Sequence, residues 1–203
     1  MAEYISFQPS DFFNVVLYTG NATADRQITL GFQPDMAWAK SRTNTENHAL
    51  FDSVRGGYRI MPDQDNAQDA NTGVTAWNSD GYVIGSSDSF NSNSQDFVNW
   101  SWKAGTTSGI ATNGSTTITP SDYSFSQTAG FSILKYTGNE TAGAKLAHGL
   151  GAVPDFMIFK RLDGTSVWQV YHQALGNTKW LNLNETDSVQ TGSTRWNNTT
   201  PAS

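Results

Sequence analysis

The chain has 203 residues, a formal net charge of −6 at pH 7 and no cysteine. The missing cysteines exclude a disulfide framework and a thiolate metal site. With only 12 Lys and Arg residues, the chain lacks the basic stripe that nucleic-acid binding requires. No apolar run approaches the roughly 18 residues of a membrane helix, so we expect neither a nucleic-acid partner nor membrane insertion. The first residues also lack the basic and apolar regions of a signal peptide, which predicts synthesis in the cytoplasm.

The chain begins with an expected lead-in at residues 1–11 and continues into a series of strand signals. β-Branched, aromatic or alternating apolar residues occur at 12–18, 26–30, 36–40, 48–54, 58–61, 74–77, 82–84 and 97–102. Gly- and Asn-rich loops separate these runs, and the Asp80-Gly81 pair is a strong hairpin signal. No stretch has the period of an amphipathic helix. The pattern predicts an all-β fold, with an antiparallel sandwich of the jelly-roll type over residues 12–104.

Two blocks of this first unit return later in the same order. Tyr-Thr-Gly-Asn occurs at 18–21 and again at 136–139, and Gly-x-x-Pro-Asp occurs at 31–35 and again at 151–155. Because order and spacing are both nearly kept, we interpret the pattern as an internal duplication. A Gly/Ser/Thr-rich stretch at 105–128 is expected to be a flexible linker, and residues 129–203 form the second unit.

The second unit has counterparts of the earlier strand signals as far as Trp196, but none of those at 82–84 and 97–102. We therefore expect two tandem β-sandwich units, the second of which lacks its closing strands. Such a unit exposes backbone groups along an edge and apolar residues, here around Phe156, Ile158 and Trp196. A strand or surface from another chain would cover them. This predicts a homo-oligomer, for which a trimer is one arrangement, or contact with a neighbouring protein.

Residues that could carry chemistry are few. His48, His148 and His172 stand in different contexts, and no two of them have metal-ligand spacing. The sequence has no Gly-x-Ser-x-Gly elbow and no Ser/His/Asp set. We therefore expect no catalytic residue, no cofactor and no enzymatic activity. Carboxylate pairs of glycosidases are defined by their separation in space, so that chemistry stays open at this point.

One acidic loop is a candidate for metal binding. Asp63, Asp65 and Asp69 alternate with other residues in a way that would suit the oxygen coordination of calcium. The glycine of the sharp turn and the closing glutamate of a calcium loop are both missing. The favoured interpretation is a solvated loop, with these three residues as the only metal candidates.

Aromatic residues are candidates for sugar binding, because an exposed ring stacks on a sugar face. The chain has seven Trp and seven Tyr residues, but most Trp residues fall within strand patterns that fill a core. We predict that Trp38, Phe51, Trp77 and Trp100 form the core of the first unit. Trp180 lies in a short segment outside the clearest patterns and is the candidate for binding a host surface glycan.

Five motifs follow one another along the chain: Leu-Tyr-Thr-Gly-Asn, Gly-Phe-Gln-Pro-Asp, Phe-Asp-Ser-Val-Arg-Gly, Asn-Ser-Asp-Gly-Tyr and Trp-Ser-Trp-Lys-Ala-Gly. Together they resemble a repeat of virion proteins from marine tailed bacteriophages, usually labelled tail fibre or tail-fibre-like, from Phe12 to Trp196. The resemblance implies a structural protein on the exterior of the tail or capsid, with other virion proteins as partners and host attachment as its task. It carries no catalytic residue over to this sequence. The alternatives are a capsid decoration or tail adaptor protein and a tailspike-type glycan depolymerase.

Overall fold

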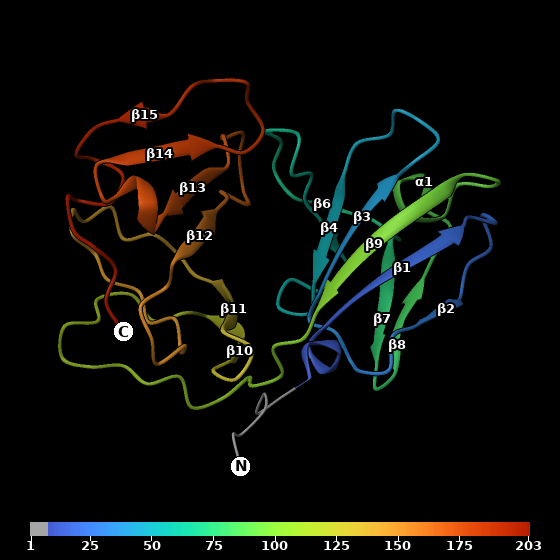
Figure 1. Cartoon of the computed structure of the whole chain (residues 1–203), viewed down its shortest axis with the longest axis horizontal. Helices are drawn as coiled ribbons and strands as arrows, with labels where there is room; N and C mark the ends of the chain where they lie inside the picture. The colour runs from blue at the N-terminus through green and yellow to red at the C-terminus, as the bar shows by residue number, and fades with distance from the viewer. Residues whose placement is uncertain (1–7) are drawn as a thin grey trace, which may run out of the picture.

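The computed structural model describes residues 8–203, which form two β units side by side (Figure 1). The first half contains η1 (Pro9–Asp11), β1 (Phe13–Thr19), β2 (Arg26–Thr29), β3 (Met36–Ser41), β4 (Ala49–Asp52), β5 (Tyr58–Arg59), β6 (Asp69–Ala70), β7 (Val74–Asn78), β8 (Gly81–Ile84), α1 (Asp88–Asn91) and β9 (Asp96–Trp102). The second half contains β10 (Asp122–Ser126), β11 (Phe131–Lys135), β12 (Phe156–Phe159), β13 (Gln169–His172), η2 (Gln173–Leu175), β14 (Lys179–Asn182) and β15 (Gln190–Thr191). The named strands pair antiparallel, which confirms the predicted all-β fold class. Of the expected lead-in, residues 1–7 lie outside the described residues.

Unit one, residues 12–104, is a sandwich of two sheets. The sheet β1-β9-β3-β4 lies in front of the sheet β2-β8-β7 in Figure 1. Their inner faces enclose a core made of Ile28, Leu30, Phe32, Ala37, Ala39, Ala49, Phe51, Val74, Tyr82, Ile84 and Phe90. The inner face of β3 and β4 carries alanines at three positions, and these leave room for the large rings of Phe51, Tyr82 and Phe90.

Two of the four residues predicted for this core lie on the other side of the sheet. Phe51 is fully buried and Trp77 packs against the core, as expected. Trp38 belongs to a separate cluster on the outer face, and it meets Trp100 there with ring centroids 6.4 Å apart. The prediction was wrong for Trp38 and Trp100 because β3 and β9 alternate between two faces that both pack. A period of two shows which residues share a face, not which face is inside.

Replacing Phe51 by Ala is expected to lower the free energy of unfolding of unit one by about 3–5 kcal/mol. The ring is fully buried and lies edge-on to Phe90, with centroids 5.2 Å apart, so the truncation leaves a cavity. Trp100→Ala is the matched control on the outer face and should cost roughly 1 kcal/mol. Urea unfolding followed by circular dichroism measures both. Equal losses would contradict the assignment of the two faces.

Unit two, residues 129–203, repeats the strand order of unit one. The sheet β12-β13-β14-β15 corresponds to β3, β4, β5 and β6, in which a bridge between Leu50 and Ile60 joins β4 to the β5 segment. The register also agrees. Trp38 pairs with Leu50 across β3 and β4, and Ile158 pairs with Val170 across β12 and β13.

The duplicated motifs make the same turns in both units. In the first Tyr-Thr-Gly-Asn motif, the Asn21 side chain accepts a hydrogen bond from the Thr23 N–H at 3.0 Å. In the second, Asn139 accepts one from Thr141 at 3.1 Å. The residue between them has a positive φ in each case, 54° and 55°. The motif is therefore a turn that the side-chain amide stabilises.

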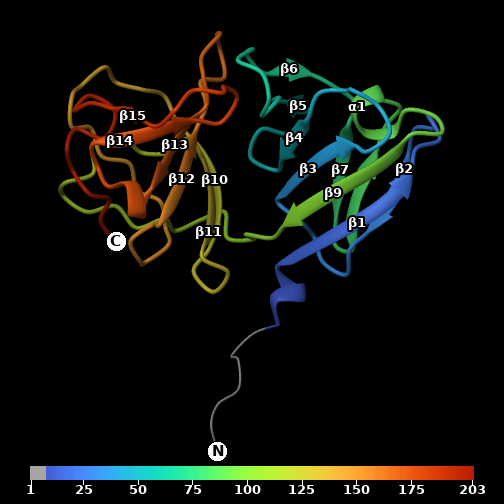
Figure 2. The ribbon, with the colours of Figure 1, turned by 45° about the horizontal axis from the view of Figure 1, so that its top comes forward.

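Part of the stretch expected to be a linker is a strand. Residues 122–126 form β10, which pairs antiparallel with β11 (Figure 2). β9 pairs with β1 in the same sense, but it also pairs with β3, whereas β10 and β11 form a separate two-stranded sheet. β10 precedes its partner β11 in the chain, whereas β9 follows its partner β1 after a long stretch of chain. A comparison of the two units in sequence order therefore does not align β10 with β9. Within residues 8–203, unit two has no counterpart of the β2-β8-β7 sheet.

The segment near the C-terminus covers the inner face of unit two in place of that sheet. The Trp196 ring lies 5.6 Å, between centroids, from both Phe159 and Tyr171. Its Nε1 donates to the Lys179 carbonyl at 2.8 Å. Trp196 therefore lies on the face opposite Phe156, and the expectation that the two residues share one uncovered face was wrong.

Candidate functional site

The three histidines make local hydrogen bonds in three different places. Nδ1 of His48 accepts from Trp38 Nε1 at 2.9 Å, which requires an unprotonated Nδ1. Burial lowers the pKa of His48 below its ordinary value and favours that form. The ring of His148 bonds a backbone carbonyl near the C-terminus, and His172 accepts from a backbone N–H of η2. The three rings are thus parts of separate structural contacts.

The metal candidates Asp63, Asp65 and Asp69 point to separate partners. Asp63 accepts from the backbone N–H of His48 at 3.1 Å, Asp65 offers its carbonyl to Lys160 at 3.1 Å, and Asp69 forms an ion pair with Arg59 at 2.6 Å. Within the described part of the chain, no group of three His, Asp or Glu side chains is arranged to hold a metal ion.

The duplication explains Asp63. In unit two, the corresponding bond runs from the Trp168 N–H to the Asn184 Oδ1 at 2.8 Å. An aspartate and an asparagine therefore fill the same position, and both supply a side-chain oxygen to the backbone. The position requires a hydrogen-bond acceptor, and a negative charge is not needed for that task.

Trp180, the candidate for sugar stacking, is partly covered by its own unit. The Arg195 guanidinium lies over the ring at 5.3 Å from its centroid. Gly192 lies so close that a Cβ there would stand 3.3 Å from the ring. One face of the ring already has a cationic neighbour, which leaves less of it for a ligand.

A buried carboxylate that the sequence did not single out connects the two units. Asp35 is 5% exposed. Its Oδ1 accepts from the Ser53 hydroxyl at 2.8 Å and from the Ser124 hydroxyl of β10 at 2.9 Å, and its Oδ2 accepts from the Ala104 N–H at 2.8 Å. The side chain thus receives hydrogen bonds from three donors, one of them on β10. In the sequence, Asp35 is marked only as the last residue of the repeated Gly-x-x-Pro-Asp motif.

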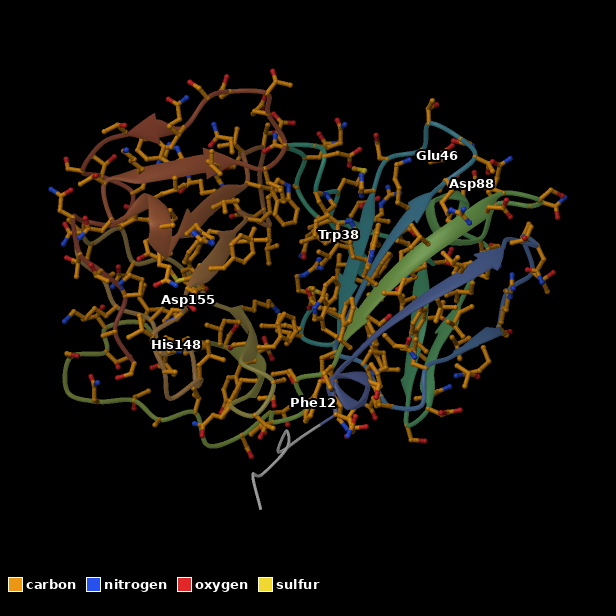
Figure 3. All side chains as sticks on the ribbon, viewed as in Figure 1. Phe12, Trp38, Glu46, Asp88, His148 and Asp155 are labelled. Carbon is orange, nitrogen blue, oxygen red and sulfur yellow. The ribbon has the colours of Figure 1, made fainter. Side chains whose placement is uncertain are left out.

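A second contact between the units is made by Trp168, which is 3% exposed. Its ring packs on the outer face of unit one, in a site that we call the tryptophan socket. The socket is formed by Met36, Trp38, Leu50 and Ile60. The indole Nε1 donates to the carbonyls of Met61 and Gln64, at 3.1 and 2.9 Å. Figure 3 shows Trp38 on the side of unit one that is turned toward unit two.

Farther along this outer face, Trp102 stacks on Phe131 of unit two with ring centroids 6.3 Å apart, and the β1 side chains beside it are exposed. The register places Val15, Trp100 and Trp38 in one row, and β1 is the edge strand of its sheet in the described chain. We define the β1–β9 face by its apolar side chains Phe13, Val15, Leu17, Val98 and Trp100. Exposure rises along β1 from 36% at Phe13 to 42% at Val15 and 61% at Leu17. Lys40 lies at one end of the face, and its ammonium donates to the Glu46 carbonyl at 2.7 Å.

The chain was compared with protein families, curated proteins and solved structures. The model of the family described as Domain of unknown function (DUF7483) matches residues 8–203. No curated protein and no solved structure matches. The family match spans both units and the segment between them, so the family's domain is the pair of units. Within residues 8–203, no helix has the length and apolar character needed to cross a membrane.

Proposed function

The chain belongs to the DUF7483 family of domains of unknown function, and we propose that it is a structural module of a tailed-bacteriophage virion. Its place would be a tail fibre or fibre-like appendage that takes part in host surface attachment. The observation that carries this proposal is the exposed β1–β9 face. Contiguous apolar patches on soluble proteins mark interaction sites more often than not.

The motifs behind the resemblance to virion proteins support a structural role. Thr-Gly-Asn forms a side-chain-stabilised turn in both units. Ser79 and Asp80 form the turn between β7 and β8, and Gly81 begins β8. Asp35 of the Pro-Asp pair joins unit one to β10. The residues of each motif therefore stabilise turns or connections between strands. A repeated, rigid β unit of this kind suits an extended assembly.

The chemistry of the face favours a protein partner. Its most exposed members, Val15 and Leu17, are aliphatic, and its two aromatic members, Phe13 and Trp100, are less exposed. Sugar-binding faces depend on aromatic rings and polar groups, whereas aliphatic faces bind apolar protein surface. Because β1 is an edge strand, a partner strand could also pair with its backbone. We therefore propose another virion protein as the ligand of this face.

Replacing Val15 and Leu17 by Ser should reduce incorporation of the chain into phage particles at least tenfold. Each side chain contributes roughly 1.5–3 kcal/mol when fully buried in an interface, and 1.4 kcal/mol is about a tenfold change in affinity. The test supplies the variant in trans to a phage that lacks its own copy and measures the chain in gradient-purified particles by mass spectrometry. The matched control is Val153→Ser with Val189→Ser, at positions 48% and 41% exposed in unit two. Equal incorporation of both variants would refute the role of the face.

Two outcomes would favour the other virion functions. If particles without the chain adsorb to host cells normally, a capsid decoration or tail adaptor protein is the better description. If the purified chain releases sugar from host polysaccharide, and one carboxylate substitution abolishes this release, the chain is a tailspike-type depolymerase.

A further inference from the structure

Unit two carries a second version of the tryptophan socket. The registers of the two units assign Ile158 to the place of Trp38, Val170 to the place of Leu50, and Leu181 to the place of Ile60. Phe156 follows Pro-Asp in the second motif as Met36 does in the first. We call these four residues, Phe156, Ile158, Val170 and Leu181, the second socket.

All four positions are apolar in both units, but three of the four in the second socket are exposed. Leu50 and Ile60 of the first socket are 6% and 5% exposed beneath Trp168. In the second socket, Phe156 is 54% exposed and Ile158 and Leu181 are each 37% exposed, while Val170, which pairs with both of the latter, is buried at 5%. Alternation along β12 puts Met157 and Phe159 on the opposite, inner side, so the exposed residues are not needed for the core of unit two. A row of apolar side chains on the solvent side of a sheet marks a surface that binds another molecule, because the row would otherwise be exposed to water.

The first socket shows what kind of surface fits this row. Its ligand within the chain is another β unit of the same repeat, which presents an aromatic ring from the start of a strand. In a second copy of this chain Trp168 is already buried in the first socket, so the apolar surface that the copy offers is its own second socket.

The distribution of charge also favours contact between copies through unit two. Residues 105–203 contain six Lys and Arg and six Asp and Glu, so their net charge is zero, and the whole net charge of −6 lies in residues 1–104. Two copies that meet through unit one would bring like charges together. Two copies that meet through unit two would meet with little repulsion, because residues 129–203 contain six Lys and Arg and five Asp and Glu, a net charge of +1.

We propose that two copies of this chain associate through their second sockets, each packing Phe156, Ile158 and Leu181 against the same residues of the partner copy. Such a contact is self-complementary and closes into a dimer with twofold symmetry. His172, whose ring lies 6.4 Å from that of Phe156 between centroids, would lie at the rim. The proposal does not depend on the virion assignment, because it concerns the isolated chain.

Sedimentation velocity on the purified chain, from about 1 μM to about 100 μM, tests the contact. We expect the wild type to form dimers within this range. Phe156→Ser with Leu181→Ser should weaken the association at least tenfold. The control Tyr58→Ser with Tyr136→Ser, at positions 44% and 38% exposed and away from the β12-β13-β14-β15 sheet, should leave it unchanged. Circular dichroism checks that each variant is folded, and Phe156→Ser alone serves if the double variant is not.

Three results would overturn the proposal. The first is a wild type that stays monomeric over the whole range. The second is an equal loss of association in the socket variant and in the control. The third is a dimer that is lost on replacing Val15 and Leu17 by Ser but not on changing the second socket. In that case the β1–β9 face, and not unit two, would hold the copies together, while the proposed function in a virion would be unaffected.

Discussion

Replacing Trp168 by Ala is expected to uncouple the two units, so that they unfold in two transitions. The ring is 3% exposed and fills the tryptophan socket, and its Nε1 bonds two carbonyls of unit one. Loss of a large buried side chain costs about 3–5 kcal/mol, which is a large share of the stability of a small domain. Differential scanning calorimetry would resolve the two transitions.

Trp168→Phe is the matched control for this variant. It keeps an aromatic ring in the socket but removes the bonds to Met61 and Gln64, so a loss of about 1–2 kcal/mol is expected. The account would be contradicted if Trp168→Ala unfolded in one transition at the wild-type midpoint, because the socket would then contribute nothing to the coupling of the units.

Replacing Asp35 by Ala is expected to destabilise the junction between unit one and β10 by about 3 kcal/mol or more. The substitution leaves the half-buried Ser53 hydroxyl, the buried Ser124 hydroxyl and the buried Ala104 N–H without their acceptor. An unpaired buried donor costs about 1–3 kcal/mol. Chemical denaturation of the full chain measures the loss.

The duplication supplies the control for this prediction. Asp155 occupies the same place in the second Pro-Asp motif but lies exposed, and among residues 8–203 its carboxylate takes none of the bonds that Asp35 takes. Asp155→Ala should therefore change the stability by no more than about 0.5 kcal/mol. Equal effects of the two substitutions would show that the Asp35 carboxylate does not stabilise the junction.

The turns and the all-β class could be predicted because they depend on local sequence. Asp80-Gly81 and the two Asn turns specify their own backbone geometry. Repetition of these motifs then indicated two units. The order β12-β13-β14-β15 follows that of β3 to β6, as a duplication requires.

The inner and outer faces of the sheets could not be predicted because both are apolar. Trp38 has more apolar surface than Ala37, yet Ala37 is the core residue. The choice is made by the opposite sheet and α1, which bring Tyr82 and Phe90 to the inner side and leave space only for small residues. That information lies far away in the sequence.

The contact residues were missed for the same reason. Trp168 and Asp35 each bind groups that are distant in the chain, and spacing does not show which distant groups meet. The sequence contained one indication of the role of Trp168. Trp168 occupies the position in unit two that His48 occupies in unit one, so the residue that contacts the tryptophan socket differs between the two copies of the repeat.

The proposal that the chain is part of a virion appendage is tested most directly by immunogold electron microscopy of purified phage particles. Antibodies raised against the chain would be applied to intact, gradient-purified particles of a phage that encodes it. The account predicts gold label on fibres or other external appendages. Unlabelled particles, with the chain recovered only from the particle-free fraction, would contradict it.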